Sequence, residues 1–294
     1  MIIIADCGST KIDWVLLDRS GKVNLRTTTA GYNAVSSGNG ELETIVRNGT
    51  GNLMMYAEEI CHIEFYGAGC GSDTACTRVR DELHKVFGNA ECEVASDMLA
   101  AARALCGDTP GIAAILGTGS NSCLYDGAKI VANVSPLGFI LGDEGSGAVL
   151  GCKLLGGILK RQFSAEVRHR FSEHYPNLRP EDIIEEVYRG KRSRAFLASF
   201  APFLSANIDI EEIDNFVTGE FENFFRRNVC LYRDEPYDFI ADFDSVPVNF
   251  TGSIAQHFQP QLRKAAEATG CKAGCIIKAP IDKLIERKRS QTDK

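Results

Sequence analysis

Two glycine-rich loops contain the residue types that bind phosphate and a divalent cation. In the first, DCGSTK, Asp6 ends an apolar run and is followed by Gly8, two hydroxyl residues and Lys11. Glycine lets backbone amides approach an anion, hydroxyls donate to phosphate oxygens, and a carboxylate holds Mg²⁺ through water. The same residues also make an ordinary turn, so this loop alone leaves both interpretations open.

The second loop, LGTGSNS, repeats this pattern later in the chain. Gly117 and Gly119 alternate with Thr118 and Ser120 directly after a second apolar run. Two such loops can hold a polyphosphate from both sides. Neither loop matches the GxxxxGK[ST] pattern of the Walker loop or the GxGxxG pattern of dinucleotide-binding turns.

Three further segments each allow a structural and a chemical interpretation. EVASDMLAAA ends a predicted strand at Asp97, which either caps the next helix or acts as a general base toward an attacking hydroxyl. GDEGSG contains Asp143 and Glu144, which either favour a helix start or bind sugar hydroxyls. FTGSI contains Gly252, where an adenine ring can lie against the backbone or where two elements simply pack closely.

The order of the predicted elements recurs along the chain. Strands at 2–5 and 14–18 flank the first loop, and an apolar strand at 112–116 leads into the second loop after the glycine-containing break at 108–111. Helical patterns dominate residues 148–235. The recurrence predicts an α/β protein of two lobes with a central cleft.

The domain boundaries follow from this order. We expect an N-terminal lobe at residues 1–109 and a C-terminal lobe at 110–280, with the helical insertion at about 148–235. The last helix, at about 281–294, is expected to pack back on the N-terminal lobe, and its RSQTDK end is expected to be disordered.

Composition restricts the classes of function. The 294 residues carry a net charge of −7 with a pI near 5.4, which argues against a general nucleic-acid surface. No stretch approaches the ~20 apolar residues of a membrane helix, and MIII does not begin a signal peptide, so a cytoplasmic protein without membrane partners is expected. The 11 cysteines lack paired CxxC spacing and are expected to be reduced, small, buried side chains.

Five motifs, DCGSTK, SDMLAAA, GTGSNS, GDEGSG and FTGSI, occur in an order that resembles the actin, hexokinase and Hsp70 ATPase superfamily. More narrowly, the chain resembles the N-acetylglucosamine kinase branch, in the group that also contains 2-hydroxyacyl-CoA dehydratase activators. The resemblance covers nearly the whole chain. It implies two ribonuclease-H-like lobes whose glycine loops grip the phosphates of ATP.

The resemblance also implies roles for individual residues. Asp97 would be the catalytic base that activates the 6-hydroxyl of the sugar. Contacts to the sugar would come from Asn33, Gly71, Asn121, Asp143 and Glu144. ATP and Mg²⁺ would be bound by Asp6, Gly8, Ser9, Thr10, Lys11, Gly117, Thr118, Gly119, Ser120, Gly252 and Ser253, with Asp6 serving the metal.

The implied function is an ATP-dependent and Mg²⁺-dependent kinase of N-acetylglucosamine or a close amino sugar, expected to be a homodimer. Leu137 stands where the animal kinase has tryptophan, and APIDKLI carries a lysine where relatives often have glycine, so the substrate is less defined than the reaction. The alternatives are another amino sugar, a sugar sensor without activity, and an ATPase activator with an iron–sulfur cluster. The activators carry a GGQD-type second loop, which differs from GTGSNS, and the zinc signature of ROK kinases is missing.

Overall fold

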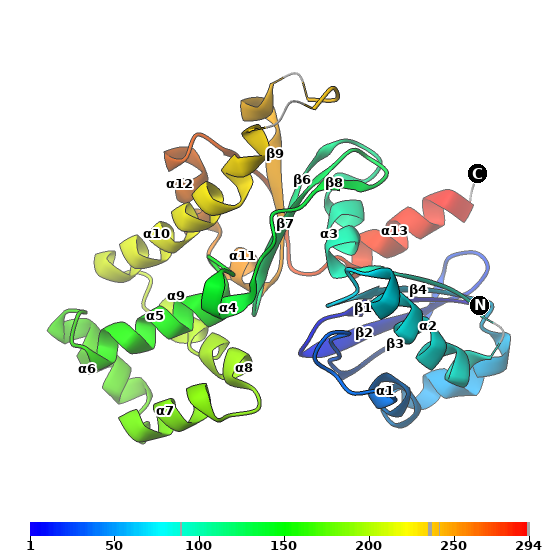
Figure 1. The fold of residues 1–294 in the computed structure, drawn as a ribbon, viewed down its shortest axis with the longest axis horizontal. Helices are drawn as coiled ribbons and strands as arrows, with labels where there is room; N and C mark the ends of the chain where they lie inside the picture. The colour runs from blue at the N-terminus through cyan, green and yellow to red at the C-terminus, as the bar shows by residue number, and fades with distance from the viewer. Residues whose placement is uncertain (89, 235–236, 241, 293–294) are drawn as a thin grey trace. The chain divides into compact units, whose positions relative to one another are not determined.

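The computed structural model describes residues 1–88, 90–234, 237–240 and 242–292, and the chain divides into two compact units (Figure 1). Unit 1 comprises Met1–Gly107 and Ala279–Lys294, and unit 2 comprises Asp108–Lys278. Each unit contains a five-stranded sheet. The C-terminal helix thus belongs to the same unit as the N-terminal strands.

Unit 1 is a mixed sheet with the order β3-β2-β1-β4-β5. The first three strands form an antiparallel meander, and the last two are parallel to β1. The strands are β1 (Ile2–Cys7), β2 (Lys11–Leu17), β3 (Val23–Ala30), β4 (His62–Gly67) and β5 (Glu91–Ser96). The helices are α1 (Glu41–Gly49), the 3-10 helix η1 (Gly51–Glu59), α2 (Asp73–Phe87), α3 (Asp97–Cys106) and α13 (Ile281–Thr292).

Both faces of the unit 1 sheet are buried, because alternate residues of a strand point to opposite faces. From β1, Ile3 and Ala5 join an apolar cluster with Trp14 and Phe65, which α1 and α2 cover. Ile4 points the other way and packs with residues of α3 and α13. The sheet therefore forms the middle of three layers.

Unit 2 repeats the strand order of unit 1, as β10-β9-β6-β7-β8. Again three antiparallel strands are followed by two parallel ones. The strands are β6 (Gly111–Leu116), β7 (Ser120–Tyr125), β8 (Ile130–Ala132), β9 (Pro247–Thr251) and β10 (Lys272–Ile277). The shared order confirms the recurrence predicted from the sequence.

The long connection between β8 and β9 is helical, as its apolar spacing predicts. Its large apolar side chains, including Phe221, Phe224 and Phe225, form one core with the sheet residue Phe250. The helices of unit 2 are α4 (Gly138–Leu141), α5 (Gly147–Leu159), α6 (Ala165–His174), α7 (Pro180–Tyr188), α8 (Ser193–Ala198), α9 (Ala201–Ala206), α10 (Glu211–Arg227), η2 (Val229–Arg233), η3 (Phe243–Ser245), α11 (Ser253–His257) and α12 (Gln259–Ala268).

Two expectations from the sequence are wrong. The C-terminal segment is helical to Thr292 rather than disordered from Arg289, because the Arg289 Nε donates to the Gly21 carbonyl at 2.7 Å and Lys288 pairs with Glu64. Residues 293–294 lie outside the described part. The cysteines are all free, as expected, but Cys61, Cys152 and Cys275 are exposed rather than buried.

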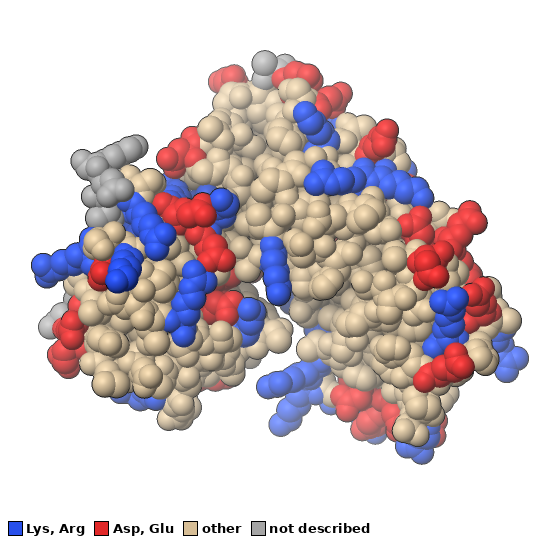
Figure 2. Space-filling view, turned by 180° about the vertical axis from the view of Figure 1, so that it is seen from behind, with Lys and Arg blue, Asp and Glu red and all other residues tan. Residues whose placement is uncertain are grey.

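The surface carries both charge signs. On the face drawn in Figure 2, lysines and arginines are interspersed with acidic side chains. Within the described residues, no helix combines the length and the apolar character needed to cross a bilayer.

The packing of α13 on unit 1 predicts the effect of truncating its apolar face. Leu284 is 2% exposed and belongs to the cluster with Ile4 and Tyr66. Leu284→Ala should lower the free energy of unfolding by about 2–4 kcal/mol, because it leaves a cavity in that core. The exposed Gln291→Ala on the same helix is the control, with an expected change within about 0.5 kcal/mol in urea denaturation. Equal stabilities of the two variants would contradict the packing of α13.

Candidate active site

The strand register of unit 1 gathers the predicted site residues at one edge of the sheet. Cys7 of β1 is paired with Gly67 of β4, which is paired with Ser96 of β5. The three parallel strands therefore end at the same level across the sheet. The loop after β1, the loop after β4 and Asp97 after β5 consequently start at neighbouring points of this edge.

The first glycine loop is held by backbone contacts with the segment after β3. The Gly8 amide donates to the Lys11 carbonyl at 2.9 Å, and the Tyr32 amide donates to the Gly8 carbonyl at 3.2 Å. A Cβ at Gly31 would lie 2.4 Å from the backbone of Ser9 and Thr10, so only glycine permits this approach. Ser9, Thr10 and Lys11 are exposed and therefore accessible to a ligand.

Asn33 links the predicted sugar-binding residues to this loop. Its Nδ2 donates to the Ser9 Oγ at 3.2 Å, while its Oδ1 accepts the amides of Val35 and Ser36 at 2.9 and 3.4 Å. Gly69, with φ of 81°, lies so close that a Cβ would be 2.7 Å from the Asn33 Oδ1. The structure therefore brings Asn33, the first loop and the loop after β4 together.

Asp6 is a buried carboxyl group close to other carboxylates at this edge. Burial and the nearby carboxylates of Asp97 and Asp13 raise the pKa of Asp6 to about 7, opposed by Lys11. Lys11 itself forms an ion pair of 2.5 Å with Asp13. Asp6 has two further carboxylates nearby, and a hard cation is favoured by such a concentration of carboxylate oxygens, so this donor set fits Mg²⁺.

One of the two interpretations of Asp97 made it the N-cap of α3. The structure shows that it is not. Ser96 is the N-cap residue, and its Oγ accepts the Leu99 amide at 3.2 Å. Asp97 is the first helical residue, and its Oδ1 accepts the Met98 amide at 2.9 Å. The capping requirement is therefore met without Asp97, and its role as a base remains a prediction.

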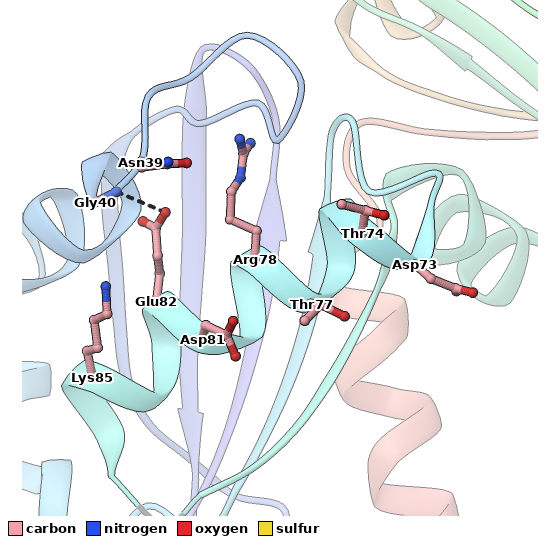
Figure 3. Close-up of a pocket in the computed structure, with 9 residues that line it drawn as sticks. All are labelled: Asn39, Gly40, Asp73, Thr74, Thr77, Arg78, Asp81, Glu82 and Lys85. Carbon is pink, nitrogen blue, oxygen red and sulfur yellow. Dashed lines mark hydrogen bonds between the residues drawn. The ribbon is translucent and has the colours of Figure 1, made fainter.

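Gly71 lies apart from these contacts. It is exposed, and a Cβ there would meet no atom within 4 Å. A groove of about 630 Å³ begins beyond it along α2, between that helix and Asn39–Gly40 (Figure 3). Its Glu82 is engaged with the Gly40 amide at 3.0 Å, and acidic and basic side chains alternate along the groove, so it has no preference for one charge.

The second glycine loop is anchored to the start of α5. The amides of Gly147 and Ala148 donate to the carbonyls of Gly117 and Thr118 at 2.8 and 3.1 Å. The first amides of α5 are therefore satisfied by the carbonyls of the loop, and these bonds fix the loop on the start of the helix. Ser120 begins β7 and is buried.

Gly252 lies against this loop because β9 is paired with β6. A Cβ at Gly252, where φ is 118°, would lie 2.2 Å from the Leu116 carbonyl oxygen, so glycine is required. Ser253 is the first residue of α11. The structure thus brings the predicted adenosine residues Gly252 and Ser253 beside the predicted phosphate loop at Gly117.

Asn121 lies one residue further, in β7. Its Oδ1 accepts from its neighbour Ser122 at 2.9 Å and from the Asn133 Nδ2 at 2.9 Å. The Nδ2 of Asn133 also donates to the Ser122 carbonyl. The Asn121 side chain is partly exposed, so the predicted sugar contact would use its remaining amide group.

Asp143 and Glu144 do not cap α5, because Ser146 is its N-cap residue. Glu144 has both oxygens engaged, at 2.6 Å from the Arg227 Nη1 and 3.2 Å from the Asn228 Nδ2. A substrate contact from Glu144 would have to use the remaining lone pairs of these two oxygens.

Asp143 has φ of 54° and forms an ion pair of 2.8 Å with Arg194. Burial raises the pKa of Asp143, and Arg194 opposes that shift. Sequence reasoning missed Arg194, because it lies 51 residues away on α8 within the helical region.

Two sheets with one strand order, each carrying a glycine loop after its first strand, define the actin-like ATPase fold. Residues 5–207 match the model of the BadF/BadG/BcrA/BcrD ATPase family. The chain therefore belongs to the BadF/BadG/BcrA/BcrD ATPase family.

Several solved structures are similar to this chain. A protein named as a putative N-acetylglucosamine kinase from Porphyromonas gingivalis is 40% identical, with a TM-score of 0.91 over 99% of both chains. One of the same name from Chromobacterium violaceum is 17% identical, with a TM-score of 0.74 over 97% of this chain and 98% of the other. A ROK family glucokinase from Streptomyces griseus, with glucose and AMPPNP, is 14% identical, with a TM-score of 0.56 over 97% of each, and shares the fold. No curated protein matches by sequence.

The raised pKa of Asp6 predicts how stability depends on pH. In metal-free buffer, folded Asp6 binds its proton more tightly than unfolded Asp6. Asp6 should therefore lower the free energy of unfolding as pH rises from about 4 to 7. This contribution should be absent in Asp6→Asn. Relative to the parent, the variant should gain about 4 kcal/mol across this window, then change no further.

The control is Asp18→Asn on the exposed turn after β2. Hydrogen bonds from Ser20 lower the pKa of Asp18, so its variant should lose stability relative to the parent as pH rises toward about 4 and then change no further. Denaturant titrations at several pH values measure both effects. Parallel pH profiles of Asp6→Asn and the parent would contradict the electrostatic strain at Asp6.

Proposed function

We propose that this protein is an ATP-dependent kinase that phosphorylates the 6-hydroxyl of N-acetylglucosamine or a closely related amino sugar. The observation that carries the proposal is the 40% identity, over 99% of both chains, to a protein named as a putative N-acetylglucosamine kinase. The local contacts support the proposal, since the Asn33 Nδ2 donates a hydrogen bond to the Ser9 Oγ of the first glycine loop. The residue that we propose to bind the sugar and one that we propose to bind phosphate are therefore direct neighbours within unit 1.

The chemistry requires positioning and charge neutralisation more than covalent catalysis. Asp97 takes the proton of the attacking 6-hydroxyl. Its carboxylate is held by the Met98 amide, which fixes its direction relative to α3. A base fixed in this way needs little reorganisation when the hydroxyl arrives.

The amide-rich loops bind the phosphates. In the first loop, the hydroxyls of Ser9 and Thr10 and the ammonium group of Lys11 donate hydrogen bonds to phosphate oxygens. In the second loop, the backbone at Thr118 and Gly119 supplies the donors, because the Gly117 amide is already bonded to the Gly119 carbonyl. Asp6 would hold Mg²⁺, which neutralises phosphate charge when bound.

The proposal is tested by ADP release from Mg-ATP with a panel of N-acetylglucosamine, N-acetylmuramic acid, glucosamine, N-acetylmannosamine and glucose. We expect turnover with one or more 2-acetamido sugars from a colourless protein, and a 6-phosphate product by NMR. No turnover with any 2-acetamido sugar would reject the proposal. ATP hydrolysis that is independent of sugar, by a brown and oxygen-sensitive protein, would instead favour the iron–sulfur activator.

The role of Asp97 is tested by Asp97→Asn. The amide keeps the acceptor for the Met98 N–H but cannot take a proton at neutral pH, so kcat should fall by ~10² or more. Mg-ATP affinity, measured by calorimetry, should remain within about threefold.

The matched control is Ser96→Ala, which removes the N-cap of α3 and leaves the carboxylate in place. It should lower stability by about 1 kcal/mol while retaining most of kcat. If Asp97→Asn keeps the parental kcat, Asp97 is not the base.

A further inference from the structure

Two cysteines of unit 2 lie with their sulfur atoms in contact, although they are 41 residues apart in the sequence. The Cys230 Sγ is 3.9 Å from the Cys271 Sγ. Cys230 lies in the 3-10 helix η2, which follows α10, and Cys271 immediately precedes β10. Both side chains are half-buried, so a small reagent can reach them while the fold holds them together.

A guanidinium lies beside both sulfurs. The Arg233 Nη1 is 3.9 Å from the Cys230 Sγ, and the Arg233 Nη2 is 3.6 Å from the Cys271 Sγ. This guanidinium is held by the Gly270 carbonyl at 2.7 Å and by the Asp244 carboxylate at 3.0 Å. A cation next to a sulfur stabilises a thiolate there, and the thiolate is the reactive form of cysteine.

The same guanidinium argues against a metal ion as the ligand of this pair. A positive charge beside both sulfurs repels a cation, and a metal site needs more than two protein ligands. Among the residues that the structure describes, the one group of three or more candidate metal ligands is His62, Glu64 and Glu93 in unit 1. The arrangement around Cys230 and Cys271 therefore suits oxidation of the two thiols.

The two thiols are not equivalent. Burial and the neighbouring Cys230 hold the pKa of Cys271 above its usual range, and Arg233 opposes this shift. Cys271 therefore keeps its proton at neutral pH. The first attack on an oxidant consequently falls to Cys230, with Cys271 as the second thiol within reach.

We propose that Cys230 and Cys271 are a reactive dithiol, assisted by Arg233, that a hydroperoxide oxidises to an intramolecular disulfide. The Cys230 thiolate attacks a peroxide oxygen, the O–O bond breaks, and the other oxygen leaves as water with the proton that Cys230 released. The Cys271 sulfur then attacks the resulting sulfenic acid, so that the S–S bond forms and the S–O bond breaks. The oxygen leaves as a second water with the proton of Cys271. The two sulfurs lose two electrons, and the peroxide gains them.

The local structure allows this bond to form. The sulfurs must approach from 3.9 Å to about 2 Å. Neither cysteine lies inside an α-helix or a strand, so an adjustment of η2 and of the residues before β10 can supply the approach. The dithiol includes no residue of the two glycine loops, and the proposal therefore goes beyond the proposed function.

The test uses the whole reduced protein, which is treated with hydrogen peroxide, blocked with iodoacetamide and digested with trypsin. We expect mass spectrometry to find the peptides 228–233 and 265–272 joined, since each contains one cysteine of the pair, and dithiothreitol to separate them. In Cys271→Ser no linked peptide should form, and Cys230 should be trapped as a sulfenic acid that dimedone labels.

The role of the guanidinium is tested by the rate of disulfide formation. Arg233→Met should slow it about tenfold, because the thiolate loses its cation. Arg233→Lys keeps a positive charge and should retain more of the parental rate. The matched control is Cys152→Ser, which removes an exposed cysteine on α5 and should leave the rate unchanged.

Full alkylation of both cysteines after peroxide treatment would overturn the proposal. So would a disulfide that joins either cysteine to a different one, or a parental rate in Arg233→Met. These measurements need neither ATP nor sugar. Their outcome is therefore separate from that of the kinase assay, and either proposal can fail while the other stands.

Discussion

The site depends on one constraint, the register of parallel strands in each sheet. In unit 1, Cys7, Gly67 and Ser96 form one row, and in unit 2, Ile115 is paired with Thr251, which is paired with Ile277. Parallel strands that stop in one row deliver their following loops to one edge. Because side chains alternate along a strand, a shift of one residue would move every side chain of that strand to the opposite face of the sheet and disrupt the packing there. The hydrophobic cores therefore fix the positions of the polar loops.

The carboxylates that lie together in unit 1 lower the stability of the folded state. Asp6 is the direct cross-strand neighbour of Asp13, and like charges in that position are unfavourable. Lys11 compensates only part of this, since it is held by Asp13 and Asp6 keeps its raised pKa. If the position of Asp6 served packing alone, an apolar residue would be more stable there. A carboxylate kept in this environment is suited to binding a cation.

The local parts of the site were predictable from the sequence, and the distant contacts were not. Glycine and hydroxyl residues after an apolar run identify both loops, because the geometry they require is set within a few residues. Ser96 and Asp97 are both good capping residues, so sequence could not decide which one caps α3. Arg194 meets Asp143 only because α5 and α8 pack together, and nothing in the spacing of 51 residues reveals that. Helical order at Arg289 likewise depends on the carbonyl of Gly21.

The repeated topology has diverged into two edges of opposite electrostatic character. The edge of unit 1 gathers Asp6, Asp13 and Asp97, which suit a cation and a proton acceptor. The edge of unit 2 has its carboxylate, Asp143, buried and paired, and a guanidinium lies beside Gly119. Phosphoryl transfer needs both kinds of environment, because the nucleophile must lose a proton while phosphate charge is neutralised. The guanidinium comes from α8, in the helical connection between β8 and β9, so this connection supplies part of the asymmetry.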